Sequence, residues 1–152
     1  MNEKPVPARE TVLESAIAAF ARKGYAGTSV QDILRATGLS KPTLYYYFES
    51  KAGLFHAILD FAYDECLRLM QESVAAVSPS DQRLVAVATA IFQFAERHQD
   101  LTRLVFATVF AAPEEIPKGC IDLTKRRRNF EFVLAIVRAA QKERVIDSRY
   151  DV

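Results

Sequence analysis

Apolar residues recur at intervals of three and four positions along almost the whole chain, which is the spacing of one face of an α-helix. The first such stripe lies within residues 8–23 and consists of Leu13, Ala16, Ile17 and Phe20. Gly24 follows the stripe, and we expect it in the left-handed conformation that ends many helices. Alternating β-branched runs are missing. The pattern therefore predicts an all-α fold.

Two short helices are predicted next, joined by a turn of only a few residues. Thr28 or Ser29 is expected to cap the first of them, and Gly38 to close it. The second covers about residues 40–48, with a serine as its N-cap and Pro42 in its first turn. Two short helices with a tight, glycine-containing turn are the layout of a helix-turn-helix that binds DNA.

Longer amphipathic helices fill the rest of the chain, because the helical spacing of apolar residues continues beyond residue 50. They are expected over about residues 50–77, 80–98, 100–112 and 120–142. The segment "PEEIPKG" before the last helix contains two prolines and a glycine, which predicts a loop. We expect a three-helix domain over residues 1–50 and a helical ligand-binding domain over residues 51–152.

Three consecutive tyrosines lie in the predicted helix 40–48. Neighbouring side chains on an α-helix point about 100° apart, so Tyr45, Tyr46 and Tyr47 cannot all be buried in one core. If Leu44 and Phe48 face inward, Tyr46 lies on the opposite side with the proline, and the other two tyrosines lie on the flanks. The sequence thus predicts a helix with an outward aromatic and hydroxylated face.

Composition narrows the class of protein. The chain has 152 residues, half of them hydrophobic, and a formal net charge of +1. So small a charge gives no long-range attraction to nucleic acid, and any DNA binding must come from a local arrangement. The chain lacks an apolar run of about 18 residues, and its start lacks the apolar stretch of a signal peptide, so we expect no membrane association and a cytoplasmic location.

Chemistry of other kinds has little support in the sequence. Without a Ser-His-Asp or Cys-His constellation or a Gly-rich phosphate loop, we expect a protein that is not an enzyme and needs no cofactor. His56 and His98 are far in sequence from Cys66 and Cys120, so metal sensing is a minor alternative. Both cysteines are expected to be reduced, and sensing through their thiols is a second minor alternative. The basic run "KRRR" at 125–128 is interpreted as a solvated helix face rather than a nucleic-acid patch.

The stretch "GYAGTSVQDILRATGLSKPTLYYYFESKAGLF", residues 24–55, resembles the DNA-binding domain of the TetR family of bacterial transcriptional repressors. The resemblance implies that helix 40–48 enters the major groove of double-stranded operator DNA. It also implies a ligand-responsive repressor that is a homodimer when complete and that a small apolar or amphipathic effector releases from DNA. The alternative from another class is a helical interaction protein that titrates a partner regulator without binding an operator.

The resemblance and the residue chemistry together give a set of candidate DNA contacts. Lys41 is expected to donate to guanine, and Pro42 and Thr43 to contact bases, including a thymine methyl group. Tyrosine hydroxyls, Lys51 and backbone N–H groups near Thr28 and Ser29 suit phosphates. The full predicted set is Thr28, Ser29, Ser40, Lys41, Pro42, Thr43, Tyr45, Tyr46, Tyr47 and Lys51.

Aromatic residues beyond residue 50 are more numerous than a small bundle core requires. We expect some of them to line an effector pocket, with plain core packing as the alternative; they are Tyr63, Phe92, Phe106, Phe110 and Phe130. Family members ordinarily continue with two more helices that pair with those of a second subunit. We therefore expect a bundle that lacks its last two helices, a weak dimer, and partly exposed side chains at Leu134, Ile136 and Val137.

Overall fold

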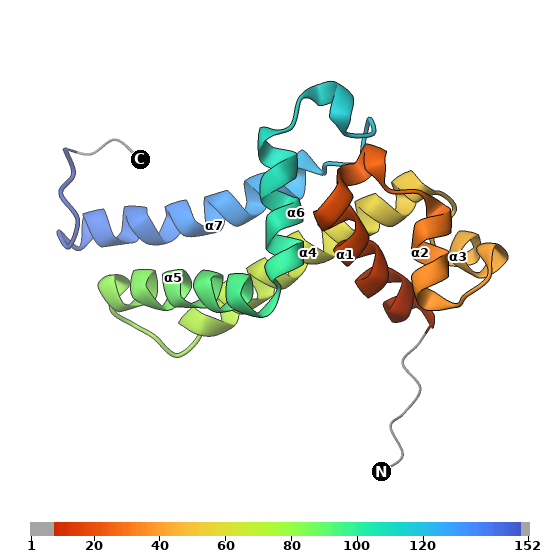
Figure 1. Cartoon of the computed structure of the whole chain (residues 1–152). Coiled ribbons are helices and arrows are strands. Elements are labelled where there is room, and N and C mark those ends of the chain that lie inside the picture. Colours follow the sequence, from red (N-terminus) through yellow and green to blue (C-terminus); the bar gives the residue numbers. More distant parts are fainter. Residues whose placement is uncertain (1–7, 150–152) are drawn as a thin grey trace, which may run out of the picture. The chain divides into compact units, whose positions relative to one another are not determined.

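The computed structural model describes residues 8–149, and all regular structure within them is helical (Figure 1). The helices are α1 (Ala8–Gly27), α2 (Val30–Thr37), α3 (Lys41–Phe48), α4 (Lys51–Val74), α5 (Ser80–Arg97), α6 (Gln99–Phe110) and α7 (Leu123–Lys142). A short 3-10 helix, η1 (Pro113–Glu115), lies between α6 and α7. The predicted all-α class is confirmed, and so is the order of the helices with its N-terminal helix-turn-helix.

Contacts divide the chain into two compact units. Unit 1 contains the chain up to Asp60 together with Gln99–Ile121, and unit 2 contains Phe61–His98 and the chain from Asp122 onward. The first part of α4 and all of α6 therefore group with the first three helices. The expected boundary between residues 50 and 51 stays a prediction.

The core of unit 1 forms around α1, which packs against α2, α3 and α6. The predicted inward pair of α3 is confirmed, since Leu44 and Phe48 are both buried. Phe20 of α1 is buried, as expected, and so is Ile33 of α2. The ring of Phe20 meets that of Phe55 from α4 edge to face, with 5.1 Å between the ring centres. Burial of these large apolar side chains is the main stabilising contribution.

Local hydrogen bonds fix the ends of the two short helices. Ser29 is the N-cap of α2: its hydroxyl accepts a bond from the Asp32 N–H, and the Asp32 carboxylate accepts one from the Ser29 N–H, which is a capping box. Gly38 ends α2 with φ 67° and ψ 6°, a left-handed conformation that glycine adopts without a steric penalty. Ser40 caps α3 by accepting from the Thr43 N–H. The predicted caps of α2 and α3 are thus confirmed.

The end of α1 differs slightly from expectation. Gly24 has φ 69° and ψ 175°, a non-helical conformation, yet one further turn follows it before α1 ends at Gly27.

Early in α4, Gly53 lies directly against the backbone carbonyl oxygen of Phe48. The gap there is too small for a Cβ atom, so α4 begins in close contact with the end of α3.

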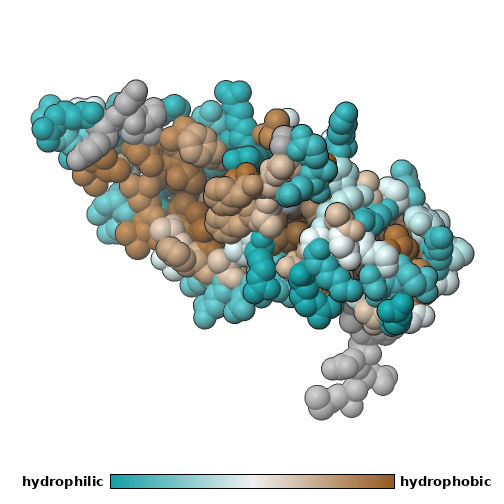
Figure 2. Space-filling view, turned by 45° about the horizontal axis from the view of Figure 1, so that its top comes forward, coloured by the Kyte–Doolittle hydropathy of each residue, from teal (hydrophilic) through white to brown (hydrophobic). Residues whose placement is uncertain are grey.

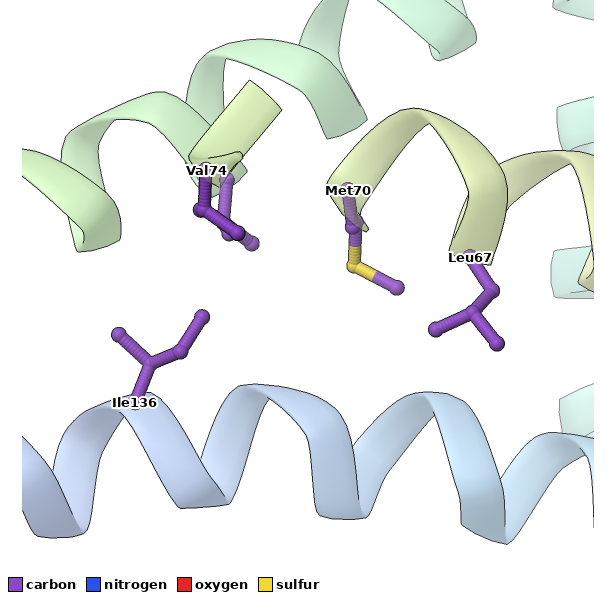
Figure 3. Close-up of a cluster of buried hydrophobic side chains, with 5 residues drawn as sticks. Leu67, Met70, Val74 and Ile136 are labelled. Carbon is purple, nitrogen blue, oxygen red and sulfur yellow. The ribbon is translucent and has the colours of Figure 1, made fainter. Parts of the chain in front are cut away.

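Unit 2 has its own hydrophobic core, in which α5 packs against α7. Leu67, Met70 and Val74 of α4, Val87 of α5 and Ile136 of α7 form one buried hydrophobic cluster (Figure 3). The expectation that Ile136 is left partly exposed is wrong, because it lies on the face of α7 that this cluster covers.

A long-range hydrogen bond caps the start of α5. The side chain of Glu143, just after α7, accepts from the hydroxyl of the buried Ser80 across 2.8 Å and from its N–H across 3.4 Å. These bonds hold the first turn of α5 to the end of α7. Both residues lie in unit 2.

The surface of unit 2 carries many apolar side chains. Figure 2 shows hydrophobic residues gathered over the part of this unit that α5 and α7 form. Phe92 is 74% exposed and Phe130 is 62% exposed. Val85 and Ile91 of α5 are exposed as well. An apolar surface of this kind is typical of a site that contacts another molecule.

Candidate nucleic-acid interface

The outer face of α3 carries the three tyrosines, as their helical positions predict. Tyr46 is 82% exposed, while Tyr45 and Tyr47 lie at the flanks and are 36% and 40% exposed. The rings of Tyr46 and Tyr47 pack edge to face with centres 5.1 Å apart. Because Leu44 and Phe48 anchor the opposite face in the core, Tyr46 is directed into solvent.

The first turn of α3 presents polar groups of known geometry. Lys41 and Pro42 are exposed, and the Lys41 ammonium lies 5.6 Å from the centre of the Tyr45 ring. The hydroxyls of Ser40 and Thr43 are 2.8 Å apart and hydrogen-bond each other. A base that used the Thr43 hydroxyl would have to share it with Ser40. The methyl group of Thr43 has no such competitor.

The turn before α2 offers fewer free groups for DNA contact than its sequence suggests. The Thr28 side chain is buried, and its hydroxyl donates to the carbonyl oxygens of Ala19 and Gly24. The N–H of Ser29 is engaged with Asp32. Both predicted residues therefore have intramolecular partners in the structure.

Asp32 lies beside the predicted DNA contacts, although it is not among the residues predicted from the sequence. The Ser29 N–H and hydroxyl donate to its carboxylate and hold its pKa below the ordinary value. Lys23 and Arg35 each lie 3.6 Å from the same carboxylate, so Asp32 offsets two cations beside the start of α2. The spacing Ser-x-x-Asp before an apolar pair is the signal that could have identified it.

Lys51 begins α4 and reaches back to the turn before α2. Its ammonium donates to the Thr28 carbonyl oxygen across 2.8 Å and lies 4.0 Å from the centre of the Tyr25 ring. Partial burial lowers the pKa of this ammonium. Lysine has three donor hydrogens, so the bond to Thr28 still leaves donors for a phosphate.

The five aromatic residues predicted for an effector pocket have different environments. Tyr63 in α4 is buried, and burial raises the pKa of its hydroxyl. The other four are 60–83% exposed; they are Phe92, Phe106, Phe110 and Phe130. Phe106 and Phe110 belong to unit 1, whereas the other three belong to unit 2.

The basic run at 125–128 behaves largely as a salt-bridged helix face. Lys125 and Arg128 donate to the two carboxylate oxygens of Asp64, across 2.7 and 2.8 Å, and lower the pKa of that carboxyl group. Arg127 lies 3.7 Å from Glu131. These carboxylates offset much of the positive charge that would otherwise attract a phosphate backbone.

Metal sites and membrane-spanning helices are both missing from residues 8–149. No group of three or more histidine, cysteine, aspartate or glutamate side chains there is arranged to hold a metal ion. None of the helices in that range combines the length and the apolar character that crossing a bilayer requires. The thiols of Cys66 and Cys120 are both unbonded to another sulfur, and burial raises the pKa of each.

The helix-turn-helix matches a known family model. Residues 12–58 match the N-terminal model described as bacterial regulatory proteins, tetR family. The chain is 30% identical over 107 residues to the probable HTH-type transcriptional regulator YttP of Bacillus subtilis, covering 68% of this chain and 51% of that protein. It is 29% identical over 134 residues to the HTH-type transcriptional activator FasR of Mycolicibacterium smegmatis, covering 81% of this chain and 61% of that protein.

A solved structure extends the similarity to almost the whole chain. The TetR family transcriptional regulator PfmR from Thermus thermophilus superimposes with a TM-score of 0.74 at 28% identity, covering 92% of this chain and 75% of that one. The curated relatives are longer than the part that this chain matches. The match covers 51% of the first relative and 61% of the second. Their names describe regulators rather than enzymes, in agreement with the expectation of a non-enzymatic protein.

Proposed function

We propose that this chain, which belongs to the TetR family of bacterial regulatory proteins, represses transcription by placing α3 in the major groove of operator DNA. The observation that carries the proposal is the outward face of α3, where exposed Pro42 and Tyr46 lie opposite the buried Leu44 and Phe48. Lys41 is exposed in the first turn of the same helix. An α-helix with its N-terminal turn exposed fits the major groove and can reach base edges from that turn.

Individual side chains take different parts in this proposal. Lys41 donates to guanine, and the Pro42 ring and the Thr43 methyl group contact bases in the groove. The three tyrosine hydroxyls donate to phosphate oxygens on either side of the helix, which sets register without reading sequence. Lys51 contributes positive charge at the start of α4, close to the turn that precedes α2.

We further propose a homodimer and a small-molecule effector. Dimeric readers of this type place two recognition helices about 34–36 Å apart, or multiples of that distance, on successive turns of DNA. The exposed apolar side chains of α5 and α7 support an interface between copies. An apolar or amphipathic effector would release the DNA if it bound the released conformation more tightly than the DNA-bound one.

Tyr63, Phe92 and Phe130, which share unit 2, remain candidates for the effector site. Phe106 and Phe110 are separate candidates in unit 1. Tyr63 is buried in unit 2, where the amide of Asn129 donates to its carbonyl oxygen across 2.8 Å. One structural neighbour, at 19% identity, is titled a putative fatty acid metabolism regulator of Clostridium perfringens. At that identity the likeness concerns the fold, so the effector's chemistry rests on the apolar character of these side chains.

Titration of promoter DNA at several salt concentrations tests the proposal. Specific binding should weaken steeply as salt increases, because phosphate contacts release counterions. Lys41→Ala should reduce discrimination at one base position by roughly 1–3 kcal/mol. Lys142→Ala, at the end of α7, is the matched control and should bind like the unchanged protein. If the chain binds no DNA at low salt but captures a partner regulator, the adaptor alternative replaces this proposal.

A further inference from the structure

Unit 1 contains a cavity of about 350 Å³ near the end of α1. The last turns of α1, the first part of α4, α6 and η1 all contribute to its wall, and all of these segments belong to unit 1. We propose that this cavity binds a small amphipathic cation, with an aromatic or aliphatic body and one ammonium group. The five aromatic residues considered above for an effector pocket are not part of its wall.

The inner wall of the cavity is apolar and firmly held. Phe20, Phe55 and Leu104 line it, although each is at most 3% exposed, so a ligand would meet side chains fixed by the core. The Tyr25 ring also lines the cavity; it stacks on Phe20 with centres 5.9 Å apart and meets Phe55 edge to face at 5.0 Å. A preformed apolar and aromatic wall of this kind suits the flat body of a small ligand.

The rim carries two ionisable side chains of opposite sign, Lys23 and Glu115. The ammonium of Lys23 lies 3.6 Å from Asp32, so its charge is already offset by a carboxylate outside the cavity. Glu115 is exposed and has no ion-pair partner within residues 8–149. The carboxylate of Glu115 is therefore the charge on the rim that remains for a ligand.

Lys51 does not alter this preference for a cation. Its ammonium is bound to the Thr28 carbonyl oxygen and lies against the Tyr25 ring. It does not belong to the cavity wall. A cation placed at Glu115 would gain charge attraction there, while its apolar body would remove water from the partly exposed Tyr25 ring and the exposed Ala107 on the cavity wall.

Three naphthalene probes that differ in charge test the proposal without DNA, so the result is independent of operator binding. They are 2-(1-naphthyl)ethylammonium, neutral 2-(1-naphthyl)ethanol and anionic 1-naphthaleneacetate, each titrated into the full chain while naphthalene fluorescence is followed. The ammonium should bind most tightly. Glu115→Gln should weaken ammonium binding about fivefold and leave the alcohol unchanged. Glu114→Gln, at the neighbouring exposed position of η1, should change neither affinity.

A second pair of variants shows whether the probe occupies this cavity. Ala107→Leu and Ala111→Leu each add volume at a lining position on or just after α6, and each should weaken binding of both ammonium and alcohol more than tenfold. Circular dichroism identifies a variant that fails to fold, in which case the other one decides. Unchanged binding in the folded variants, tighter binding of the acetate, or no saturable binding of the ammonium would overturn the proposal.

Discussion

The ammonium of Lys51 donates a hydrogen bond to the carbonyl oxygen of Thr28, and this bond ties the start of α4 to the turn that precedes α2. The same ammonium lies 4.0 Å from the Tyr25 ring centre. A lysine that the sequence suggests only as a phosphate contact therefore also stabilises the fold of unit 1. Loss of this side chain should affect both stability and DNA affinity.

Lys51→Met keeps most of the aliphatic stem over Tyr25 but removes the charge and the donor. We expect unfolding free energy to fall by about 1–2 kcal/mol, since a hydrogen bond and a cation–π contact are lost together. Urea unfolding followed by circular dichroism measures the change. Lys41→Met, at an exposed position, should cost about 0.5 kcal/mol or less. Equal effects of the two substitutions would contradict a structural role for Lys51.

The stability of the capping box should depend on pH through Asp32. The pKa of this carboxyl group is lowered in the folded chain. Its contribution to stability is therefore complete above the pKa of the unfolded chain, about 3.9, and is lost as the pH falls through the pKa of the folded chain. Asp32→Asn should lower stability at pH 7 and make the loss between pH 5 and pH 2 less steep. Thermal unfolding across that range measures both, and a variant with an unchanged slope would refute the assignment.

Tyr46 provides the cleanest test of the outer face of α3, because it is the most exposed of the three tyrosines. Tyr46→Phe removes only the hydroxyl and should weaken operator binding several-fold, and equally for strong and weak operator variants. Stability should change by less than about 0.5 kcal/mol, since the ring is exposed. Fluorescence anisotropy with two labelled DNA sequences measures the effect. Selective loss for one sequence would assign Tyr46 to base reading instead.

The bond between Ser80 and Glu143 should contribute to the stability of unit 2. Ser80→Ala removes the buried hydroxyl that donates to Glu143 and should cost about 1 kcal/mol. Amide hydrogen exchange should accelerate in the first turn of α5, which loses part of its cap. Ser148→Ala, at an exposed position after α7, is a control that should leave exchange in α5 unchanged. If exchange in that turn stays slow in Ser80→Ala, the bond has no such role.

Replacing two neighbouring side chains of α7 with alanine should change the stability of the chain by very different amounts. Ile136→Ala should destabilise the chain by roughly 2–5 kcal/mol, because Ile136 is buried in the cluster that contains Met70 and Val74 (Figure 3). Val137→Ala, on the half-buried side of the helix, should cost about 1 kcal/mol or less. Equilibrium unfolding in urea gives both values. Similar losses would mean that Ile136 is not in the core.

The structural features that could be predicted from the sequence depend on residues that lie close together in the chain. Ser40 lies three positions before the Thr43 N–H that it caps, and Leu44 and Phe48 are one helical turn apart, so spacing alone identifies both relationships. The outward position of Tyr46 follows from the same helical geometry. This is why the helix-turn-helix could be derived nearly complete.

Features that escaped prediction depend on partners far away in the chain. Ser80 and Glu143 are 63 positions apart, and Lys51 meets Thr28 across 23 positions, so neither bond has a local signal. The burial of Ile136 beside half-buried Val137 likewise depends on which face of α7 meets the cluster from α4. Periodicity identifies an apolar helix face but not the segment that covers it.

The contact between Gly53 and the Phe48 carbonyl oxygen makes a missing side chain a determinant of how closely α3 and α4 approach. The backbones of α3 and α4 approach so closely there that even one methyl group would act as a wedge, and the end of α3 would have to swing aside to admit it. Under the proposed function, the direction of the α3 tyrosines toward a DNA groove would therefore depend on a residue of α4 that is not among the proposed DNA contacts. A substitution at position 53 would then change operator preference without altering any of the side chains proposed to read bases.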